Sequence, residues 1–193
     1  MKYRLIKDFM PRVLAYVDGA DPQIVKAFIS DAVIQFLRDT KLTSEEVCLD
    51  IDPCIHSYKI KTRLPIMEIL QIKFFVGGRR YPSVLFSYTI KGNTFYFDYA
   101  AAVAGKIRVE LEVLTYPPRD SEKVPAIVYE EWQDAIAAYA LYKLFLMPNT
   151  DWTSTQAAGI QLEAYNKLRM QALVTRVSKG KPMQVKLLNK RKY

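Results

Sequence analysis

The chain has 193 residues, of which 50% are apolar and 25% are charged, and this composition excludes a wholly disordered protein. A chain of this length can bury a core of its own, and no run approaches the roughly twenty apolar residues that cross a bilayer, so we expect no contact with a membrane. Two cysteines, Cys48 and Cys54, are too few for a disulfide-stabilised secreted scaffold, so we expect reduced thiols and synthesis in the cytoplasm.

The net charge of +8 is concentrated at the C-terminal end of the chain. From residue 176 onward there is no acid, and the basic residues are Arg176, Lys179, Lys181, Lys186, Lys190, Arg191 and Lys192. These residues carry seven of the eight excess charges, so the rest of the chain is nearly neutral. A basic terminal segment typically binds an acidic protein surface or nucleic acid.

Helices are predicted at the start of the chain. Residues 5–17 indicate a short helix that bends or begins near Pro11. In residues 21–40, Asp21 can accept from the first free amides as N-cap, and Pro22 suits the first helical position. The inward-facing stripe of this helix is predicted to consist of Ile24, Phe28, Ala32 and Phe36, with Val25, Ile29, Val33 and Leu37 beside them.

Between about residues 45 and 116 the apolar period changes to two, which predicts an antiparallel sheet with one buried and one solvated face. Residues 45–52 and 106–116 alternate most clearly. Gly77 and Gly78 can adopt the positive φ of a tight hairpin, and the turn of Gly92 and Asn93 makes a second hairpin between 83–90 and 94–99.

A long apolar helix follows Pro125, which can open it. From Ala135 to Met147 its only charged residue is Lys143, so it must be covered on most sides by its own domain or by neighbouring copies. Pro148 ends this helix because it disfavours helical geometry at the preceding residue.

The last helix is predicted from a capping box and an apolar stripe. Thr153 and Gln156 have the spacing of the box. The stripe consists of Ala158, Leu162, Tyr165, Leu168 and Ala172. The order of elements predicts an α+β fold, a helical bundle with an inserted antiparallel β lobe. We assign the bundle to residues 1–44 and 124–178, the lobe to 45–123, and a basic C-terminal arm to 179–193.

One cluster could carry chemistry. The segment "CLDIDPCIH" contains Cys48, Asp50, Asp52, Cys54 and His56. Strand alternation places the first three on one side, but the spacing matches no common zinc site, so we expect no metal and no cofactor. His56 is the only histidine, and no P-loop, dinucleotide-binding or nucleophile-elbow motif occurs, so we expect no enzyme. A hydrolase or metal enzyme using Asp50, Asp52 and His56 remains an alternative.

An arginine pair and a group of aromatic residues are each compatible with nucleic-acid binding or with a purely structural role. Arg79 and Arg80 follow two glycines, as in a phosphate loop, but an exposed hairpin tip is the favoured interpretation. Aromatic residues such as Phe95 and Phe97 could stack on single-stranded bases, although their shared strand face favours the core.

The C-terminal arm combines charge with apolar residues. Val185, Leu187 and Leu188 lie among its lysines, which favours docking in a partner's groove over bare phosphate contact. Phosphate contact and a solvated terminus remain alternatives.

Four segments follow one another in an order typical of one family: residues 8–40, "SYKIKTRLP" at 57–65, "IRVELEVLTYPPRDSEKVP" at 107–125, and residues 129–168. The last carries most weight, with an alanine-rich helix, a stop at Met147–Pro148, Trp152, then Ala157 and Ala158 before Tyr165. In this order the whole chain resembles the head-to-tail adaptor proteins of short-tailed bacteriophages, also called tail tubular protein A or gatekeeper-type connectors.

The resemblance implies a non-enzymatic structural protein of the virion, assembled in the host cytoplasm. Family members form a ring, usually of twelve copies, beneath the portal protein, and the ring extends the channel for genomic DNA and receives the tail nozzle protein. The implied portal-docking arm comprises Arg176, Lys179, Lys181, Val185, Lys186, Leu187, Leu188, Lys190, Arg191 and Lys192. Arg79 and Arg80 would lie at the tip of the lobe that faces the tail.

The alternative to this function is a nucleic-acid-binding accessory protein that uses the basic C-terminal tail with Arg79 and Arg80. It predicts a DNA affinity that falls steeply with salt.

Overall fold

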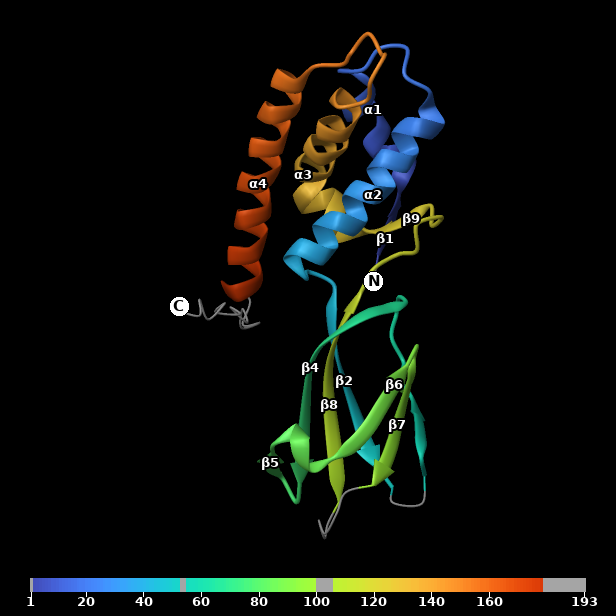
Figure 1. Ribbon diagram of the computed structural model, residues 1–193, viewed down its shortest axis with the longest axis vertical. Helices are drawn as coiled ribbons and strands as arrows, with labels where there is room; N and C mark the ends of the chain where they lie inside the picture. The colour runs from blue at the N-terminus through green and yellow to red at the C-terminus, as the bar shows by residue number, and fades with distance from the viewer. Residues whose placement is uncertain (1, 53–54, 100–105, 179–193) are drawn as a thin grey trace, which may run out of the picture. The chain divides into compact units, whose positions relative to one another are not determined.

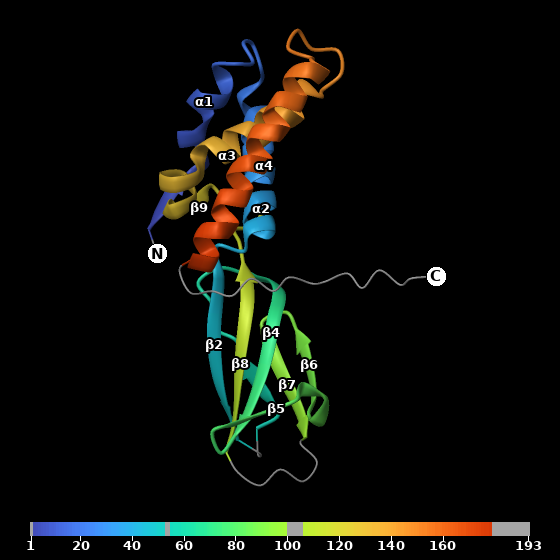
Figure 2. The same cartoon turned by 90° about the vertical axis from the view of Figure 1, so that its left-hand side faces the viewer.

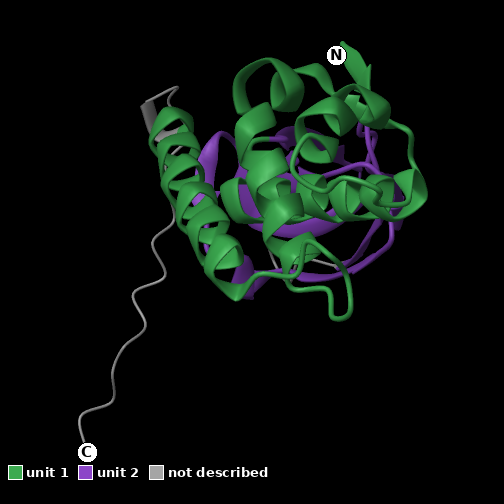
Figure 3. Ribbon diagram, turned by 90° about the horizontal axis from the view of Figure 1, so that it is seen from above, with its two compact units in different colours: residues 1–42, 120–193 green, residues 43–119 purple. Residues whose placement is uncertain are grey.

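The computed structural model describes residues 2–52, 55–99 and 106–178 (Figure 1). These residues form four α-helices and three antiparallel sheets, which confirms the α+β fold. The chain divides into a helical unit of residues 1–42 and 120–193 and a β unit of residues 43–119 (Figure 3).

The β unit begins at residue 43 and ends at residue 119, whereas the predicted β lobe ran from residue 45 to residue 123. Ser44 begins strand β2 (Ser44–Ile51) of the β unit, because it pairs with Leu114. Lys123 begins strand β9 (Lys123–Pro125) of the helical unit, because it pairs with Leu5. Short pairings of this kind leave no periodic pattern in the sequence.

The helical unit begins with strand β1 (Tyr3–Leu5), a 3-10 helix (Ile6–Phe9) and helix α1 (Met10–Leu14). The helix expected near Pro11 therefore exists but has only five residues. Strand β1 was not predicted, since three residues are too few for alternation to show.

Helix α2 (Pro22–Thr40) begins as predicted, because the Asp21 carboxylate accepts from the Gln23 backbone N–H at 2.8 Å. The buried apolar residues of α2 are Val25, Ile29, Ala32, Val33, Phe36 and Leu37. Ile24 is 38% exposed and Phe28 half-buried, so the stripe is narrower than predicted.

Helix α3 (Ala126–Phe145) lies between α2 and α4 (Thr155–Ser178) and contacts both (Figure 1). Ala135, Ile136, Ala140 and Leu144 are completely buried. Pro125 is the N-cap of α3 instead of its first helical residue, and Trp132 has a non-helical φ of −131°, so the helix is kinked there. The apolar character of α3 thus follows from its central place in its own unit.

The cap of α4 differs from the predicted capping box. The Ser154 hydroxyl accepts from the Ala157 backbone N–H at 3.2 Å, whereas the Thr153 hydroxyl donates to the Met147 carbonyl at 2.6 Å. The hydroxyl of Thr153 is thus bonded to the loop that follows α3, and Ser154, one residue later, caps the N-terminus of α4. Within the predicted stripe, Ala158, Tyr165 and Ala172 are buried, whereas Leu162 and Leu168 are half-buried.

The β unit contains two sheets where we had expected one. The first has the order β2-β8-β4-β5, in which β4 is Ile66–Val76, β5 is Arg79–Tyr81 and β8 is Ile107–Thr115. The second has the order β3-β7-β6, with β3 at Ser57–Lys59, β6 at Ser87–Lys91 and β7 at Thr94–Tyr99. A 3-10 helix, Ser83–Leu85, separates β5 from β6, so the chain changes sheets there.

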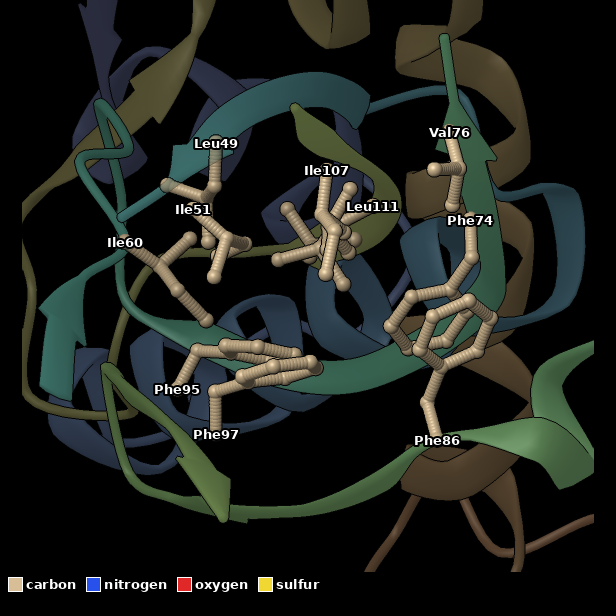
Figure 4. Close-up of a cluster of buried hydrophobic side chains, with 12 residues drawn as sticks. Leu49, Ile51, Ile60, Phe74, Val76, Phe86, Phe95, Phe97, Ile107 and Leu111 are labelled. Atoms are coloured by element: carbon tan, nitrogen blue, oxygen red, sulfur yellow. The ribbon is translucent and has the colours of Figure 1, made fainter. Parts of the chain in front are cut away.

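The core of the β unit lies between these sheets. Figure 2 shows β2, β8 and β4 side by side, with β6 and β7 behind them. Phe74 stacks on Phe86 with ring centroids 4.2 Å apart, and Phe95 and Phe97 are buried in the same cluster (Figure 4). Both hairpins are confirmed: Gly77 and Gly78 have φ of +54° and +81°, and Gly92 has +55°.

Candidate functional site

The outer face of α4 carries apolar side chains. Ile160, Met170 and Val174 are 61%, 52% and 64% exposed, although Ala158, Tyr165 and Ala172 already supply the buried face of the same helix. Fourteen residues separate Ile160 from Val174, about four helical turns, so the two lie on one side of α4. Glu163 and Lys167 are exposed on the same side, so these apolar residues are spaced along the helix among charged ones, as on a helix face that a partner protein covers only in part.

A groove lies between α1, α3 and α4, with a volume of about 560 Å³. Its apolar lining consists of Pro11, Ala15, Tyr16, Ala137, Ala138, Leu141, Ala164 and Leu168. Four of these residues are alanines, so the hollow exists because the side chains that line it are small. The volume is within the range of ligand pockets, about 300–1,000 Å³.

The polar residues that line this groove are Arg12, Asp134 and Gln161. The Arg12 guanidinium donates a hydrogen bond to the Asp134 carboxylate. The side chain of Asp134 is 64% exposed, so this carboxylate can accept a further donor from outside. The groove is therefore an apolar surface with one neutralised ion pair along it.

Tyr165 joins α4 to the end of α2. Its hydroxyl donates to the Asp39 carboxylate at 2.8 Å, and the Arg169 guanidinium lies 3.5 Å from the same oxygen. Burial, and then the hydrogen bond to Asp39, raise the pKa of Tyr165. A tyrosine held protonated in this way supports packing and is a poor general base.

Arg176 is not part of a free arm. It lies four residues after Ala172 in α4, on the inner face, and is only 6% exposed. Arg176 therefore lies within α4 and before the segment 179–193, and its part in portal docking stays a prediction. The other predicted arm residues lie outside the described residues: Lys179, Lys181, Val185, Lys186, Leu187, Leu188, Lys190, Arg191 and Lys192.

Arg79 and Arg80 are both exposed in β5, directly after the turn of Gly77 and Gly78. The glycines supply the positive φ of a two-residue hairpin, which confirms the hairpin interpretation over a phosphate loop. That these arginines face a tail protein stays a prediction.

Within the "CLDIDPCIH" cluster, Cys54 lies outside the described residues, and the described members form no metal site. Cys48 and Asp50 are exposed on β2, and the Asp50 carboxylate accepts from Arg108 Nε at 3.0 Å, which raises the pKa of Arg108. His56 is exposed, and its backbone carbonyl accepts from the Phe97 N–H at 3.0 Å. Among the residues that the structure describes, no three histidine, cysteine or acidic side chains could hold a metal ion.

Neither a comparison with models of protein families nor a comparison with curated proteins finds a match for this chain. In the described part of the chain, no helix combines the length and apolar character that a membrane span requires. The two surfaces of the helical unit, the groove and the outer face of α4, are the features that bear on function.

Sequence reasoning missed both surfaces. The run of alanines within "DAIAAYA" was a signal for close helix packing, but it did not show that a hollow remains beside α1. Ile160, Met170 and Val174 were passed over because the last helix was described by its buried stripe alone.

Proposed function

We propose that this chain is the adaptor subunit of a short-tailed bacteriophage, a non-enzymatic virion protein. Copies of it form a ring, of about twelve subunits in the family it resembles, between the portal protein and the tail nozzle protein. The ring extends the channel through which genomic DNA is retained and ejected.

The observation that carries this proposal is the two-sided apolar character of α4. Its inner residues Ala158 and Tyr165 pack against the helical unit, while Ile160 and Val174 are exposed on the outside. In a ring, each subunit contacts two neighbours through different surfaces, so an outward-facing apolar helix face has a neighbour to cover it. The order of sequence segments supports the same function.

The β unit supports a role in contacting another component. Its core is closed between its own sheets by Phe74, Phe86 and Phe95, so it does not need the helical unit to bury its apolar residues. An inserted lobe with its own core can present a hairpin, here with Arg79 and Arg80, to the tail nozzle protein.

The arm of residues 179–193 is the proposed portal-docking segment. A chain that stops after Ser178 removes the arm and keeps every described residue of α4. We expect the full-length chain to co-sediment with portal rings of the phage that encodes it, and the shortened chain to lose most of this binding.

The competing function of DNA binding is tested in the same samples. Phe95 and Phe97 are buried, so they do not offer a base-stacking platform. If the full-length chain failed to sediment with portal rings but shifted duplex DNA, with an affinity that fell steeply between low and moderate salt, the adaptor proposal would be wrong.

A further inference from the structure

The groove between α1, α3 and α4 has the properties of a surface for an apolar peptide. Ala137 and Ala138 are buried in its floor, Ala164 and Leu168 line its α4 side, and Tyr16 is 62% exposed at its edge. Small floor residues allow a peptide backbone to approach closely, and aliphatic side chains can then fill the hollow.

We propose that this groove binds residues 183–188 of the same chain. This segment reads "MQVKLL" and supplies Met183, Val185, Leu187 and Leu188. A terminal segment that acted by charge alone would have no use for these aliphatic residues, whereas an apolar groove buries them.

The reach of the chain supports an occupant from the same molecule. Helix α4 lines the groove at Leu168, and its last described residue is Ser178. The ten helical residues between them span about 15 Å, and the six residues from Lys179 to Gln184 can extend over about 20 Å. A chain that turns back along α4 therefore brings Val185 to the level of Leu168, and the short connection gives a high local concentration.

Charge supports the same placement. Lys186 lies between Val185 and Leu187, so it would stand at the edge of the groove when its neighbours are buried. Arg12 is neutralised by Asp134, and the exposed Asp134 carboxylate can accept a second cationic donor. The groove thus accepts both the apolar residues and the lysine of this segment.

This inference does not rest on the adaptor proposal. It states that the free subunit holds its C-terminal segment on its own helical unit. Any partner that binds Val185, Leu187 or Leu188 must then displace the segment from the groove first.

A pair of engineered cysteines tests the contact in the full-length chain. With Cys48 and Cys54 replaced by serine, Ala164→Cys is combined with Leu187→Cys. A disulfide requires the two Cα atoms to come within about 7 Å, so its rate reports the contact. The matched control combines Asn166→Cys with Leu187→Cys, because Asn166 is exposed on α4 and does not line the groove.

We expect the Ala164→Cys pair to form a disulfide within one chain about tenfold faster than the Asn166→Cys pair, with the mass of a monomer. Adding Leu188→Asp should slow the Ala164→Cys pair to the rate of the control, since an aspartate cannot be buried in the groove. Because Ala164 and Asn166 are both exposed, circular dichroism should show an unchanged fold.

Three results would overturn the inference. Equal rates for the two pairs would mean that the segment has no preference for the groove. A disulfide found only in dimers would mean that the groove takes the segment of a second copy. If Leu188→Asp left the rate of disulfide formation unchanged, the short covalent connection between α4 and the segment would explain the cross-link, and apolar contact with the groove would not.

Discussion

Tyr165 is the residue that most directly connects the last helix to the rest of the helical unit. It is 2% exposed, and its hydroxyl donates to Asp39 at the end of α2. Its ring also contacts Tyr139 of α3, with centroids 4.8 Å apart. One side chain therefore links α4 to both neighbouring helices.

Replacing Tyr165 by Phe should lower the free energy of unfolding at pH 7 by about 1.5–3 kcal/mol, the contribution of a hydrogen bond to a charged group. The pKa of Tyr165 is raised by folding above its ordinary value of 10.0, so its contribution is complete below pH 10 and declines above it. Urea unfolding should therefore show a smaller difference between wild type and Tyr165→Phe at pH 11 than at pH 7.

Tyr142→Phe is the matched control, since Tyr142 is half-buried and contacts Tyr139 through its ring. We expect it to change stability little at either pH. An equal loss for Tyr165→Phe at both pH values would contradict the assigned role of the hydroxyl.

For single residues, the sequence predicts those features that depend only on neighbouring residues in the chain. The Asp21 cap, the hairpin glycines and the buried pair Phe95 and Phe97 were all predictable, because each follows from a turn, a cap or strand alternation. The burial of Arg176 was not predictable, since it depends on how α4 packs against the rest of the helical unit. Ser154 displaced Thr153 as the cap because Thr153 bonds to the preceding loop.

At the scale of elements, strands and helices were predictable and their partners were not. Alternation in β2 and β8 shows which face is buried, since Leu49, Val109 and Leu111 all point to the core. It does not show which strand pairs with which, so the two sheets were expected as one. The chain passes from the first sheet to the second through the 3-10 helix at Ser83–Leu85. This helix occupies the first residues of the segment 83–90, which was predicted to be one strand.

Two glycines provide a matched test of the elements that contain them. Gly78 has φ of +81° in the β4–β5 turn, so Gly78→Ala should destabilise the β unit by about 1 kcal/mol. Gly159 lies in α4 with open space around its Cβ position, so Gly159→Ala should stabilise the helical unit by up to about 1 kcal/mol. Thermal unfolding should therefore give shifts of opposite sign, and shifts of the same sign would contradict these assignments.

At the scale of the whole molecule, two units with separate cores share one chain, and the helical unit carries the surfaces that suggest assembly. The groove is formed by helices from both ends of the sequence, whereas the outer face belongs to α4 alone. No local pattern could reveal the groove, because a hollow depends on which helices become neighbours.

The double substitution Ile160→Asp and Val174→Asp should prevent ring formation and leave the subunit folded. Both side chains are exposed, so the free energy of unfolding should change by less than about 1 kcal/mol. Within an interface, an unpaired carboxylate costs more than this, so association should weaken at least about tenfold. Native mass spectrometry measures the assembly, and Asn166→Asp, which adds a carboxylate to α4 without removing an apolar side chain, should assemble like wild type.

Electron microscopy of portal rings mixed with the chain tests the central claim most directly. We expect class averages with a second ring stacked on the portal, about twelvefold symmetric as in the family that the sequence resembles. The ring should be absent for the chain that ends at Ser178 and for the Ile160→Asp and Val174→Asp variant. Portal rings that stay bare at saturating concentrations of folded full-length chain would contradict the adaptor function.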